Sequence, residues 1–535
     1  MPLLDIKDLN VSIGGKPILR SIALSVAPGE ILGLVGESGS GKSMTLLSAM
    51  RLLPANAEAT GQITLDGDDL TKKSERAMCA VRGERIGMIF QEPMTALNPV
   101  QTIGAQVAEM FVQHRRMNAR DAVKAASEQL AKVGLSADRA PPNRYPHQLS
   151  GGQRQRVVIA MATALAPKLL LADEPTTALD VTTQAGILEL LKSLARRDGA
   201  GLVFVTHDLA VVAGLADRIA IMKDGAIVEE GPAPAIFRTM QHPYSIVLRT
   251  AATLPARAPR APLTEAPIAE AKDISIVYRA RGLFGGKKET VAVDGVSLTL
   301  APGEIVGVVG ESGSGKSTLA RALLGVQPLT KGRIAIGGDD PAQARGPALR
   351  AIRKRIQVVF QDPYGSLNPR HRVERVVSEP LHLAGRLSAQ ERRQRVETML
   401  QRVGLAASDA DRYPHAFSGG QRQRIAIARA LILEPKVIVL DEAVSALDVT
   451  IRAQIIELLR DLSDRLGLAY LFITHDLSVV RALADRVLVM QNGKVVKEGR
   501  TAEVFAAPKH PYTSALLAAS PDLEAALRAR EETKS

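Results

Sequence analysis

Two copies of a glycine-rich segment are the part of this sequence best suited to chemistry. Gly36-Glu-Ser-Gly-Ser-Gly-Lys-Ser43 recurs as Gly310-Glu-Ser-Gly-Ser-Gly-Lys-Ser317. Glycines let backbone N–H groups turn inward around a polyphosphate, and the N-terminus of a following helix adds partial positive charge. Lys42 and Lys316 would reach the β- and γ-phosphates, and the serine after each would offer a hydroxyl to Mg²⁺. The pattern predicts two nucleotide sites, and a merely tight turn is the less favoured interpretation because the whole motif occurs twice.

Adjacent carboxylates end an apolar stretch in each copy, as Asp173 with Glu174 and as Asp441 with Glu442. Side chains alternate across a strand, so the two carboxylates of a pair can take different roles. The aspartate would hold Mg²⁺ through water, and the glutamate would polarise the attacking water. A solvated strand end is the alternative, which the nearby phosphate loop makes less favoured.

His207 and His475 each follow an apolar run and a threonine, at the same distance from the carboxylates in both copies. A single histidine there is more often a capping or packing residue. Its recurrence favours a sensor of the γ-phosphate, although duplication alone would also preserve a structural histidine. Gln91 and Gln361 could orient water or bind Mg²⁺, but their spacing alone indicates only loop residues.

The elements that must position these residues follow from the duplication. Short apolar runs such as Glu30–Val35, Glu304–Val309 and Leu202–Val205 predict buried strands that alternate with helical stretches. This alternation predicts an α/β fold with a parallel sheet covered on both faces. Residues 101–145 and 371–412 predict a helical subdomain inserted in each copy.

The boundary between the copies is predicted from proline content. Leu254–Glu270 carries four prolines among alanines, which favours an extended, semi-rigid tether over a packed element. We therefore expect one domain over residues 1–250, a linker over 251–270 and a second domain over 271–535.

Composition narrows the class of protein. The 535 residues are 46% hydrophobic and 23% charged, which is ordinary for a soluble globular chain. The single cysteine, Cys79, excludes a disulfide framework, a cysteine zinc site and an iron–sulfur cluster within one chain and fits a reducing compartment. The sequence contains no apolar run of about 18 residues, so it predicts no membrane span. Its first residues lack the pattern of a signal peptide.

The net charge of +12 does not by itself indicate a nucleic-acid partner. Basic residues are scattered in short clusters, aromatic residues make up 3% and tryptophan is absent. Base-stacking platforms need aromatic side chains. A solvated, partly membrane-facing surface is therefore favoured over nucleic-acid binding.

Taken together, these motifs resemble the ATP-binding cassette (ABC) family over nearly the whole chain. Leu149-Ser-Gly-Gly-Gln153 and Phe417-Ser-Gly-Gly-Gln421 look like its signature motif, and the phosphate loops look like its Walker A motif. The resemblance implies two tandem P-loop domains, each a RecA-like core with an antiparallel β subdomain. It also implies that the domains pair head to tail, and that Asp180 and Asp448 belong to the loop crossing their interface.

The resemblance assigns two composite sites. Site one would use the phosphate loop, Gln91, Asp173, Glu174 and His207 of the first copy with the signature motif of the second, and site two the reverse. The ATP-binding residues it implies are Gly36, Glu37, Ser38, Gly39, Ser40, Gly41, Lys42, Ser43, Met44, Ser150, Gly151, Gly152, Gln153, Tyr278, Gly310, Glu311, Ser312, Gly313, Ser314, Gly315, Lys316, Ser317, Thr318, Ser418, Gly419, Gly420 and Gln421. The Mg²⁺ ligands it implies are Ser43, Gln91, Asp173, Ser317, Gln361 and Asp441, and the catalytic residues are Glu174, Glu442, His207, His475, Gln91 and Gln361.

Phe90–Pro99, Phe360–Pro369, His242–Ser245 and His510–Thr513 are similar to the dipeptide/oligopeptide/nickel importer branch. A fused chain of this length is similar to Yej-type peptide importer ATPases and to fused dipeptide or glutathione importer subunits. This implies two integral-membrane permeases, an extracytoplasmic solute-binding protein reached through them, and a peripheral place on the cytoplasmic face of a bacterial inner membrane. Peptides, glutathione, nickel chelates and opine-like compounds all remain open as solutes.

Three features depart from the branch pattern. Tyr278 occupies the adenine-stacking position of the second copy, but the first has Ile13 there, so site one would hold adenine more weakly. Asp441-Glu-Ala-Val444 replaces the Asp-Glu-Pro-Thr of the first copy, with the glutamate intact. The cysteine-rich C-terminal segments of many branch members are absent.

Three other classes of protein stay open but less favoured. A ribosome-acting tandem cassette usually has a long charged helical linker, and a DNA-repair cassette needs zinc-binding cysteines. A nucleotide-gated scaffold would bind ATP without hydrolysis, which the paired glutamates disfavour.

Overall fold

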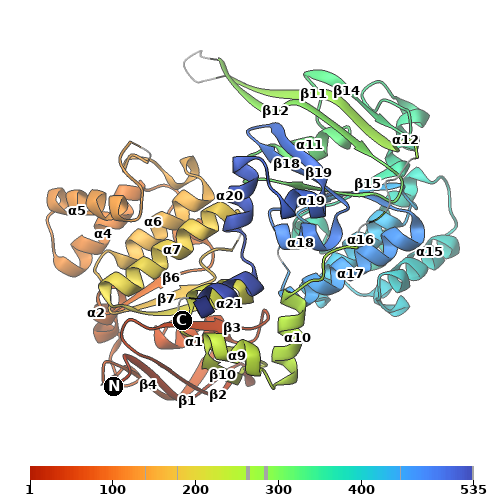
Figure 1. Cartoon of the computed structure of the whole chain (residues 1–535). Helices are drawn as coiled ribbons and strands as arrows, with labels where there is room; N and C mark the ends of the chain where they lie inside the picture. The colour runs from red at the N-terminus through yellow and green to blue at the C-terminus, as the bar shows by residue number, and fades with distance from the viewer. Residues whose placement is uncertain are drawn as a thin grey trace.

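The computed structural model describes the chain except residues 139, 178, 259, 261–264, 282–286, 446 and 533–535. We call the elements from β1 to α10 the first half and those from β11 to α21 the second half. Each half contains a six-stranded sheet, a smaller antiparallel sheet and a group of helices, and the two halves lie side by side (Figure 1).

The six-stranded sheets carry the predicted apolar runs at their centres. The first has the order β10 (Ala226–Pro232), β9 (Arg218–Lys223), β3 (Ile31–Val35), β8 (Gly201–Thr206), β7 (Leu169–Asp173) and β6 (Ile86–Ile89). The second has the order β15 (Ile356–Val359), β16 (Val437–Asp441), β17 (Ala469–Ile473), β13 (Ile305–Val309), β18 (Arg486–Gln491) and β19 (Lys494–Arg500). All pairs are parallel except the edge pairs β9–β10 and β18–β19. Every residue of β3 and β8 is buried, as expected for a parallel sheet covered on both faces, so the predicted α/β class is confirmed.

An antiparallel sheet joins each core. In the first half it consists of β1 (Leu4–Ile13), β2 (Lys16–Val26), β4 (Ala57–Leu65) and β5 (Asp68–Asp69). In the second half it consists of β11 (Ala269–Arg281), β12 (Lys287–Leu300) and β14 (Lys331–Ile336).

The helices of the two halves correspond in order. Those of the first half are α1 (Lys42–Ala49), α2 (Glu75–Glu84), α3 (Pro93–Ala96), α4 (Ile103–Arg115), α5 (Ala119–Lys132), α6 (Gly151–Thr163), α7 (Val181–Asp198), α8 (Leu209–Leu215), α9 (Ala233–Thr239) and α10 (Pro243–Ala252). Those of the second are α11 (Lys316–Leu323), α12 (Gly346–Arg355), α13 (Pro363–Ser366), α14 (Val373–Ser378), α15 (Ala389–Arg402), α16 (Gly419–Leu431), α17 (Val449–Leu466), α18 (Leu477–Leu483), α19 (Thr501–Ala506), α20 (Pro511–Ala519) and α21 (Leu523–Glu532). Short 3₁₀ turns lie at Pro146–Gln148, Glu379–Leu383, Ala407–Asp411 and Pro414–Ala416.

The predicted inserted helices start where the sequence supplies caps. Thr102 and Asn118 accept hydrogen bonds from the backbone N–H groups of Ala105 and Asp121 and begin α4 and α5. The two helices pack on each other and on α6, which follows the signature motif. The prediction of a helical segment in each half is therefore confirmed.

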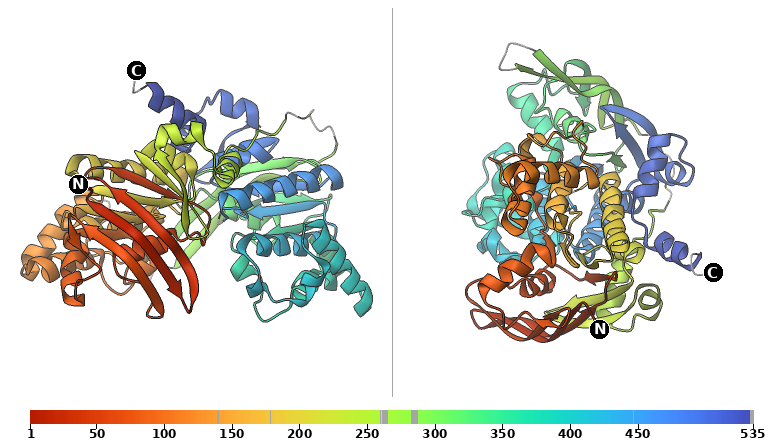
Figure 2. Two further views of the ribbon diagram at one scale, coloured as in Figure 1. Left: turned by 90° about the horizontal axis from the view of Figure 1, so that it is seen from below. Right: turned by 90° about the vertical axis from the view of Figure 1, so that its left-hand side faces the viewer.

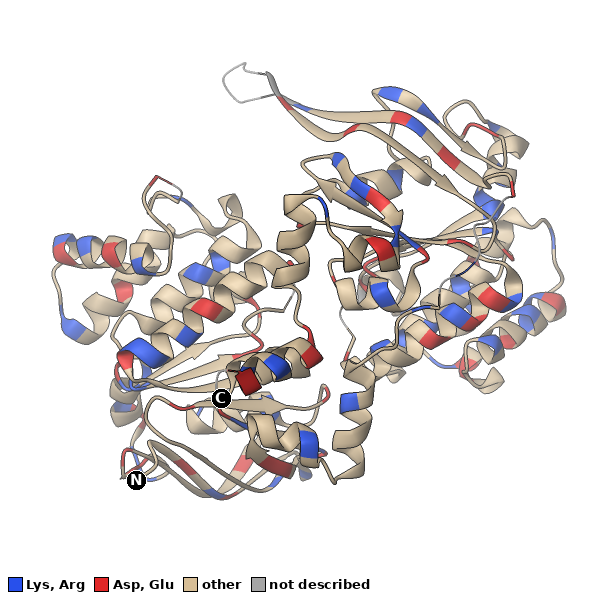
Figure 3. Cartoon of the chain, in the orientation of Figure 1, with Lys and Arg blue, Asp and Glu red and all other residues tan. Residues whose placement is uncertain are grey.

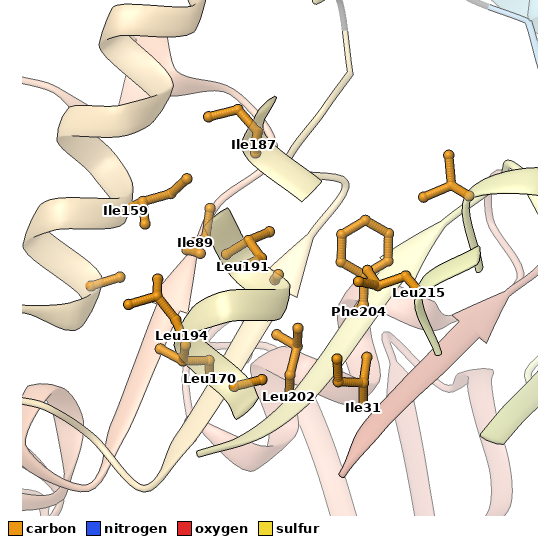
Figure 4. Close-up of a cluster of buried hydrophobic side chains, with 14 of the residues drawn as sticks. Ile31, Ile89, Ile159, Leu170, Ile187, Leu191, Leu194, Leu202, Phe204 and Leu215 are labelled. Atoms are coloured by element: carbon orange, nitrogen blue, oxygen red, sulfur yellow. The ribbon is translucent and has the colours of Figure 1, made fainter. Parts of the chain in front are cut away.

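The largest core of the first half lies between the six-stranded sheet and the helices α6, α7 and α8. Phe204 on β8 is fully buried beside Ile31 and Leu202 of the sheet (Figure 4). Side chains of α7, including Leu191, complete this layer. The packing fixes the sheet whose strand ends carry the candidate site.

The two halves exchange helices at their C-terminal ends. Helix α10 of the first half packs on α17 of the second, and α20 of the second half packs on α7 of the first. Helix α21 then packs on α8 of the first half, where Leu523 joins the core (Figures 1 and 2). Each half is therefore held by a segment of the other.

The proline-rich segment between the halves is predicted to be an extended, semi-rigid tether, and its described residues from 254 to 268 form neither helix nor strand but pack in part on the second half. Leu254 packs against the core of the second half, and the Arg257 side chain is only 7% exposed. The Arg257 guanidinium pairs with Asp485 at 2.8 Å and with Asp464 at 3.1 Å. In the first half, Asp217 is equivalent to Asp485, and it pairs with Arg196 of the same half. The extended conformation is confirmed for the described residues, whereas the absence of packing is wrong at Leu254 and Arg257. Prolines 259 and 262 lie outside the described residues.

Charged side chains are scattered over both halves rather than gathered on one of them (Figure 3). Cys79 on α2 is exposed. Within the described part of the chain, none of the helices combines the length and the apolar character that crossing a bilayer requires.

Removing the Phe204 ring tests whether this core holds the first half. We expect Phe204→Ala to lower the free energy of unfolding by about 3–5 kcal/mol, because it leaves a cavity that the rigid sheet cannot close. Val123→Ala on α5, where the side chain is 52% exposed, is the control and should change it by less than about 0.5 kcal/mol. Urea unfolding followed by circular dichroism measures both, and equal effects would contradict this description of the core.

Candidate active site

Each phosphate loop connects the central strand of a six-stranded sheet to a helix, β3 to α1 and β13 to α11. The loop needs glycine at position 36, because a Cβ there would lie 2.3 Å from the carbonyl oxygen of Met222. The backbone of Gly41 has φ +104°, a left-handed conformation that favours glycine and starts α1. The loop is therefore shaped by its residue types before any ligand binds.

The lysine of each loop is buried and held by the loop itself. Lys42 is 5% exposed, and its Nζ donates to the carbonyl oxygens of Gly36 at 2.8 Å and Glu37 at 2.7 Å. Lys316 makes the same two bonds in its own loop, to Gly310 and Glu311. Burial lowers the pKa of both lysines against the opposing effect of nearby carboxylates. An entering phosphate can replace these carbonyl contacts with a stronger, charge-assisted interaction.

A hydroxyl and a carboxylate meet beside each loop. Ser43 Oγ donates to Asp173 Oδ1 at 3.0 Å, and Ser317 Oγ donates to Asp441 Oδ1 at 3.2 Å. Burial raises the pKa of both aspartates, and the serine hydrogen bonds oppose it. Mg²⁺ prefers hard oxygen ligands, so the residues of these pairs fit a site that could hold a magnesium ion.

The predicted catalytic residues of the first half converge on Glu174. Gln91 Nε2 donates to Glu174 Oε2 at 3.0 Å, and His207 Nδ1 lies 3.4 Å from Oε1. Thr177, which the sequence analysis did not single out, donates from Oγ1 to Oε2 at 2.9 Å. The glutamate backbone has φ +44°, a strained conformation for a non-glycine residue that often marks a functional site.

The second half repeats this arrangement around Glu442 with one change. Gln361 Nε2 donates to Glu442 Oε2 at 2.8 Å, His475 Nδ1 lies 3.6 Å from the same oxygen, and φ is +50°. Ser445, at the position equivalent to Thr177, donates from its hydroxyl to the backbone carbonyl of Glu442 instead. The second carboxylate therefore has one hydrogen bond fewer from this loop.

Local electrostatics keeps both glutamates ionised. Burial alone would raise the pKa of Glu174, but His207, Thr177 and Lys42 together outweigh it and lower the pKa to about 2. For Glu442, burial is likewise outweighed by His475 and Lys316, so its pKa is also lowered. A carboxylate that stays charged at neutral pH can orient and polarise a water molecule.

The signature motifs begin helices α6 and α16. Ser150 accepts a hydrogen bond from the Gln153 backbone N–H while the Gln153 side chain accepts one from Ser150, and Ser418 with Gln421 does the same. These reciprocal caps bond backbone N–H groups at the N-terminus of each helix, which carries a partial positive charge.

The interface places each phosphate loop against the opposite half. The Ser38 backbone N–H donates to Asp448 Oδ1 at 2.9 Å, and Thr450 Oγ1 donates to the side chain of Glu37. In the reverse direction Thr182 Oγ1 donates to Glu311 Oε1 at 2.7 Å. The Ser312 backbone also hydrogen-bonds Asp180 and helps to lower its pKa against burial. These bonds place the phosphate loop of each half against the start of α7 or α17 in the other half.

Two tyrosines that the sequence analysis used only as branch markers belong to the phosphate loops. Tyr244 Oη accepts a hydrogen bond from the Glu37 backbone N–H at 2.9 Å, and Tyr512 Oη accepts one from Glu311 at 2.9 Å. The recurrence of His-Pro-Tyr near the end of each half was the signal that could have found them. Thr177 had no such signal, because its equivalent is Ser445.

The two predicted adenine-stacking positions, Tyr278 and Ile13, lie on equivalent strands of the small antiparallel sheets. Tyr278 on β11 is 40% exposed, and its Oη donates to Gln327 Oε1 at 3.2 Å. Ile13 ends β1 at the equivalent place and pairs with Lys16 and Ala57 on its neighbours. An exposed ring is available for stacking in the second half, and the first half offers an aliphatic side chain instead.

The signature glycines can be tested by matched substitutions. A Cβ at Gly420 would lie 2.3 Å from Ile451 Cγ2, a stiff β-branched side chain on α17, whereas a Cβ at Gly419 meets nothing within 4 Å. We expect Gly420→Ala to lower the melting temperature and the ATP turnover, because α16 must move away from α17. Gly419→Ala should leave the melting temperature unchanged or raise it slightly. Adding Ile451→Ala should restore part of the Gly420→Ala loss, and a lack of any restoration would contradict the steric explanation.

Comparison with known proteins gives the same family for both halves. The family model described as ABC transporter matches residues 19–177 and 293–445. The model described as oligopeptide/dipeptide transporter, C-terminal region, matches residues 496–535, which include Tyr512.

Curated relatives match almost the full chain. It is 48% identical over 533 residues to the peptidoglycan transport ATP-binding protein YejF of Agrobacterium fabrum, covering 98% of this chain and 97% of that protein. It is 45% identical over 538 residues to the glutathione import ATP-binding protein GsiA of Salmonella choleraesuis, covering 94% of this chain and 86% of that protein. The resemblance stated from the motifs is thus confirmed, and nothing in these matches supports a ribosome-acting protein. The chain belongs to the ABC transporter family and is one of its ATP-binding, ATP-hydrolysing subunits.

Proposed function

We propose that this subunit hydrolyses Mg²⁺-ATP at two composite sites and thereby powers uptake of peptides or related small solutes through a bacterial importer. The observation that carries the proposal is the complete cluster of glutamine, histidine and glutamate at both sheets, with a strained, ionised glutamate in each. A regulatory cassette without turnover would not need to keep both clusters. The solute class follows from the peptidoglycan and glutathione transport named for the relatives.

In site one the backbone N–H groups of residues 36–41 and the Lys42 ammonium bind the phosphates, and Ser43, Asp173 and Gln91 hold Mg²⁺. When bound, the metal ion would supply charge neutralisation for the phosphates. Glu174 polarises the attacking water, and His207, in contact with that carboxylate, contacts the γ-phosphate. From the second half come Ser418, the backbone amides of Gly419 and Gly420, and Gln421, with Tyr278 reserved for the other site.

Site two uses the equivalent residues of the second half. Lys316 and the amides of residues 310–315 bind the phosphates, and Ser317, Asp441 and Gln361 hold Mg²⁺. Glu442 polarises water, with His475 at the γ-phosphate, and Tyr278 stacks on the adenine. The signature residues Ser150, Gly151, Gly152 and Gln153 close this site from the first half.

Binding at both sites draws the halves together, and release of phosphate lets them part, a ligand-driven domain motion. We further propose a division into residues 1–250, a linker over 251–270 and residues 271–535. The partners are two integral-membrane permeases, docked in the grooves beside Gln91 and Gln361, and through them an extracytoplasmic solute-binding protein. The subunit would then lie peripherally on the cytoplasmic face of the inner membrane, with no nucleic acid bound.

Exchange of the adenine-stacking residue tests the assignment of the two sites. An aromatic ring adds about 0.5–1.5 kcal/mol of stacking. We therefore expect Ile13→Tyr to tighten nucleotide binding at site one, and Tyr278→Ile to weaken it at site two, each by about 2- to 10-fold. Fluorescent-nucleotide titration measures both, and no change in either variant would remove Tyr278 and position 13 from the adenine sites.

The catalytic assignment is tested with Glu174→Gln, Glu442→Gln and the double variant. Amides keep the shape of the side chain but cannot polarise water as a base, so turnover should fall about 10²- to 10⁴-fold in the double variant with ATP binding retained. Normal turnover in the double variant would contradict the assignment.

The same double variant, tagged and purified from detergent-solubilised native cells, tests the transport function. We expect two polytopic membrane proteins to copurify with it when ATP is present. Recovery of ribosomal proteins or nucleic acid in their place would overturn the importer while leaving the ATPase chemistry intact.

A further inference from the structure

The interface between the halves contains a buried charge that only one half supplies. A cavity of about 250 Å³ at this interface is lined by His207 and Asp208 of the first half and by Arg452, His475 and Asp476 of the second. Gln184 also lines it and occupies on α7 the position that Arg452 occupies on α17. Arg481 and Asp522 line the same cavity and pair with each other at 3.4 Å. Asp208 and Asp476 therefore both lie near Arg452, which has no arginine counterpart on α7.

Arg452 connects two loops of the second half. Its Nη1 donates to Asp476 Oδ2 at 2.8 Å, and its Nη2 donates to the backbone carbonyl of Leu447 at 3.2 Å. The pair is largely buried, with the arginine side chain 15% exposed and the aspartate 24%. Because the planar guanidinium bonds one group in each loop and is largely buried, it leaves both loops little freedom to move.

Each of these loops leads to a different nucleotide site. Asp476 follows His475, which contacts Glu442 of site two, and its other carboxylate oxygen caps α18 through the backbone N–H groups of Ser478 and Val479. Leu447 precedes Asp448, which accepts the hydrogen bond from Ser38 in the phosphate loop of site one. An unbroken chain of contacts thus runs from the phosphate loop of site one to the catalytic glutamate of site two.

The reverse chain lacks its middle link. Asp180 and Thr182 bond the phosphate loop of site two, and His207 contacts Glu174 of site one. Asp208 caps α8 as Asp476 caps α18. The structure gives Arg452 the bond to Asp476 but gives Gln184, within the described residues, no side-chain bond to Asp208 or Leu179. Burial raises the pKa of Asp208, and the positive charge of Arg452 opposes this effect from across the interface.

We propose that Arg452 is a positioning residue that couples the two sites unequally. It transmits the state of the phosphate loop of site one to His475 and Glu442, so that turnover at site two depends on it. Turnover at site one depends on it far less, because Arg452 reaches that site only through its charge on Asp208. Binding free energies must couple reciprocally, but catalytic rates need not, so such an unequal effect on turnover is permitted. The inference rests on the site assignment proposed above.

Site-resolved turnover of the full-length chain tests the inference. In a Glu174→Gln background only site two turns over, and in a Glu442→Gln background only site one does. We expect Arg452→Gln to lower kcat about 2- to 30-fold in the first background and less than about twofold in the second, with KM for ATP nearly unchanged in both. An equal loss in both backgrounds, or a loss confined to KM, would overturn the proposal.

Two further variants separate positioning from simple stability. Arg452→Lys keeps the charge but reaches only one of the two loops, so it should restore part of the site-two kcat. Gln184→Arg is the matched substitution in the first half. It should supply the missing link there, so that turnover at site one also comes to depend on this position while turnover at site two stays unchanged. A fall in melting temperature that accounts for the Arg452→Gln loss, without rescue by lysine, would contradict a positioning role.

Photolabelling tests the same unequal coupling in a protein that keeps both glutamates. Vanadate-trapped 8-azido-ATP marks the half that supplies each phosphate loop, and proteolysis in residues 253–268 separates the halves. We expect Arg452→Gln to reduce trapping on the second half only. Equal reduction on both would overturn the coupling, whereas full turnover in the Glu174→Gln/Glu442→Gln protein would overturn the site assignment itself.

Discussion

Each phosphate loop, whose backbone N–H groups we propose to bind nucleotide, also contacts the opposite half. Ser38 donates its N–H to Asp448, and Ser312 hydrogen-bonds Asp180, so the loop that must cradle phosphate is also the contact point of the interface. A movement of the loop therefore changes its hydrogen bonds to the opposite half. The helix exchange through α10, α20 and α21 keeps these contacts in register, because each half carries a segment packed on the other.

The charges at the sites are arranged to be ready for a ligand. Lys42 is buried and bonded to carbonyl groups of its own loop, which hold it near the place where phosphate charge would develop. Glu174 sits in a strained backbone conformation at the end of β7, with its carboxylate bonded by Gln91 and Thr177. Such strain persists only where the surrounding structure over-determines it, and here the Glu174 N–H bonds the carbonyl of Val205 on the neighbouring strand.

The two halves share one arrangement of elements but differ at several positions near the candidate sites. The adenine position is Ile13 in one half and Tyr278 in the other, and Arg452 has only Gln184 as its equivalent. The segment between the halves adds another difference, because Arg257 fills in the second half the role that Arg196 fills in the first. A fused chain keeps the two halves at high effective concentration, so each is free to specialise for its own side.

The class of fold, the two phosphate loops and the carboxylates after the apolar runs could be predicted from the residues alone, whereas the roles of Gln91 and Gln361 came from the resemblance to the ABC family. Glycine spacing, apolar runs and caps act within a few residues, so local rules are enough for the first group. The sequence did not reveal the bonds of Tyr244 and Tyr512 to the phosphate loops, the buried Arg257 or the link through Arg452. Each of these joins segments that are distant along the chain, with Tyr244 bonding Glu37 and Arg257 pairing with Asp485. Only tertiary packing brings such groups together, because hydrogen bonds between remote residues depend on how the sheets and helices pack and leave no periodic trace in the sequence.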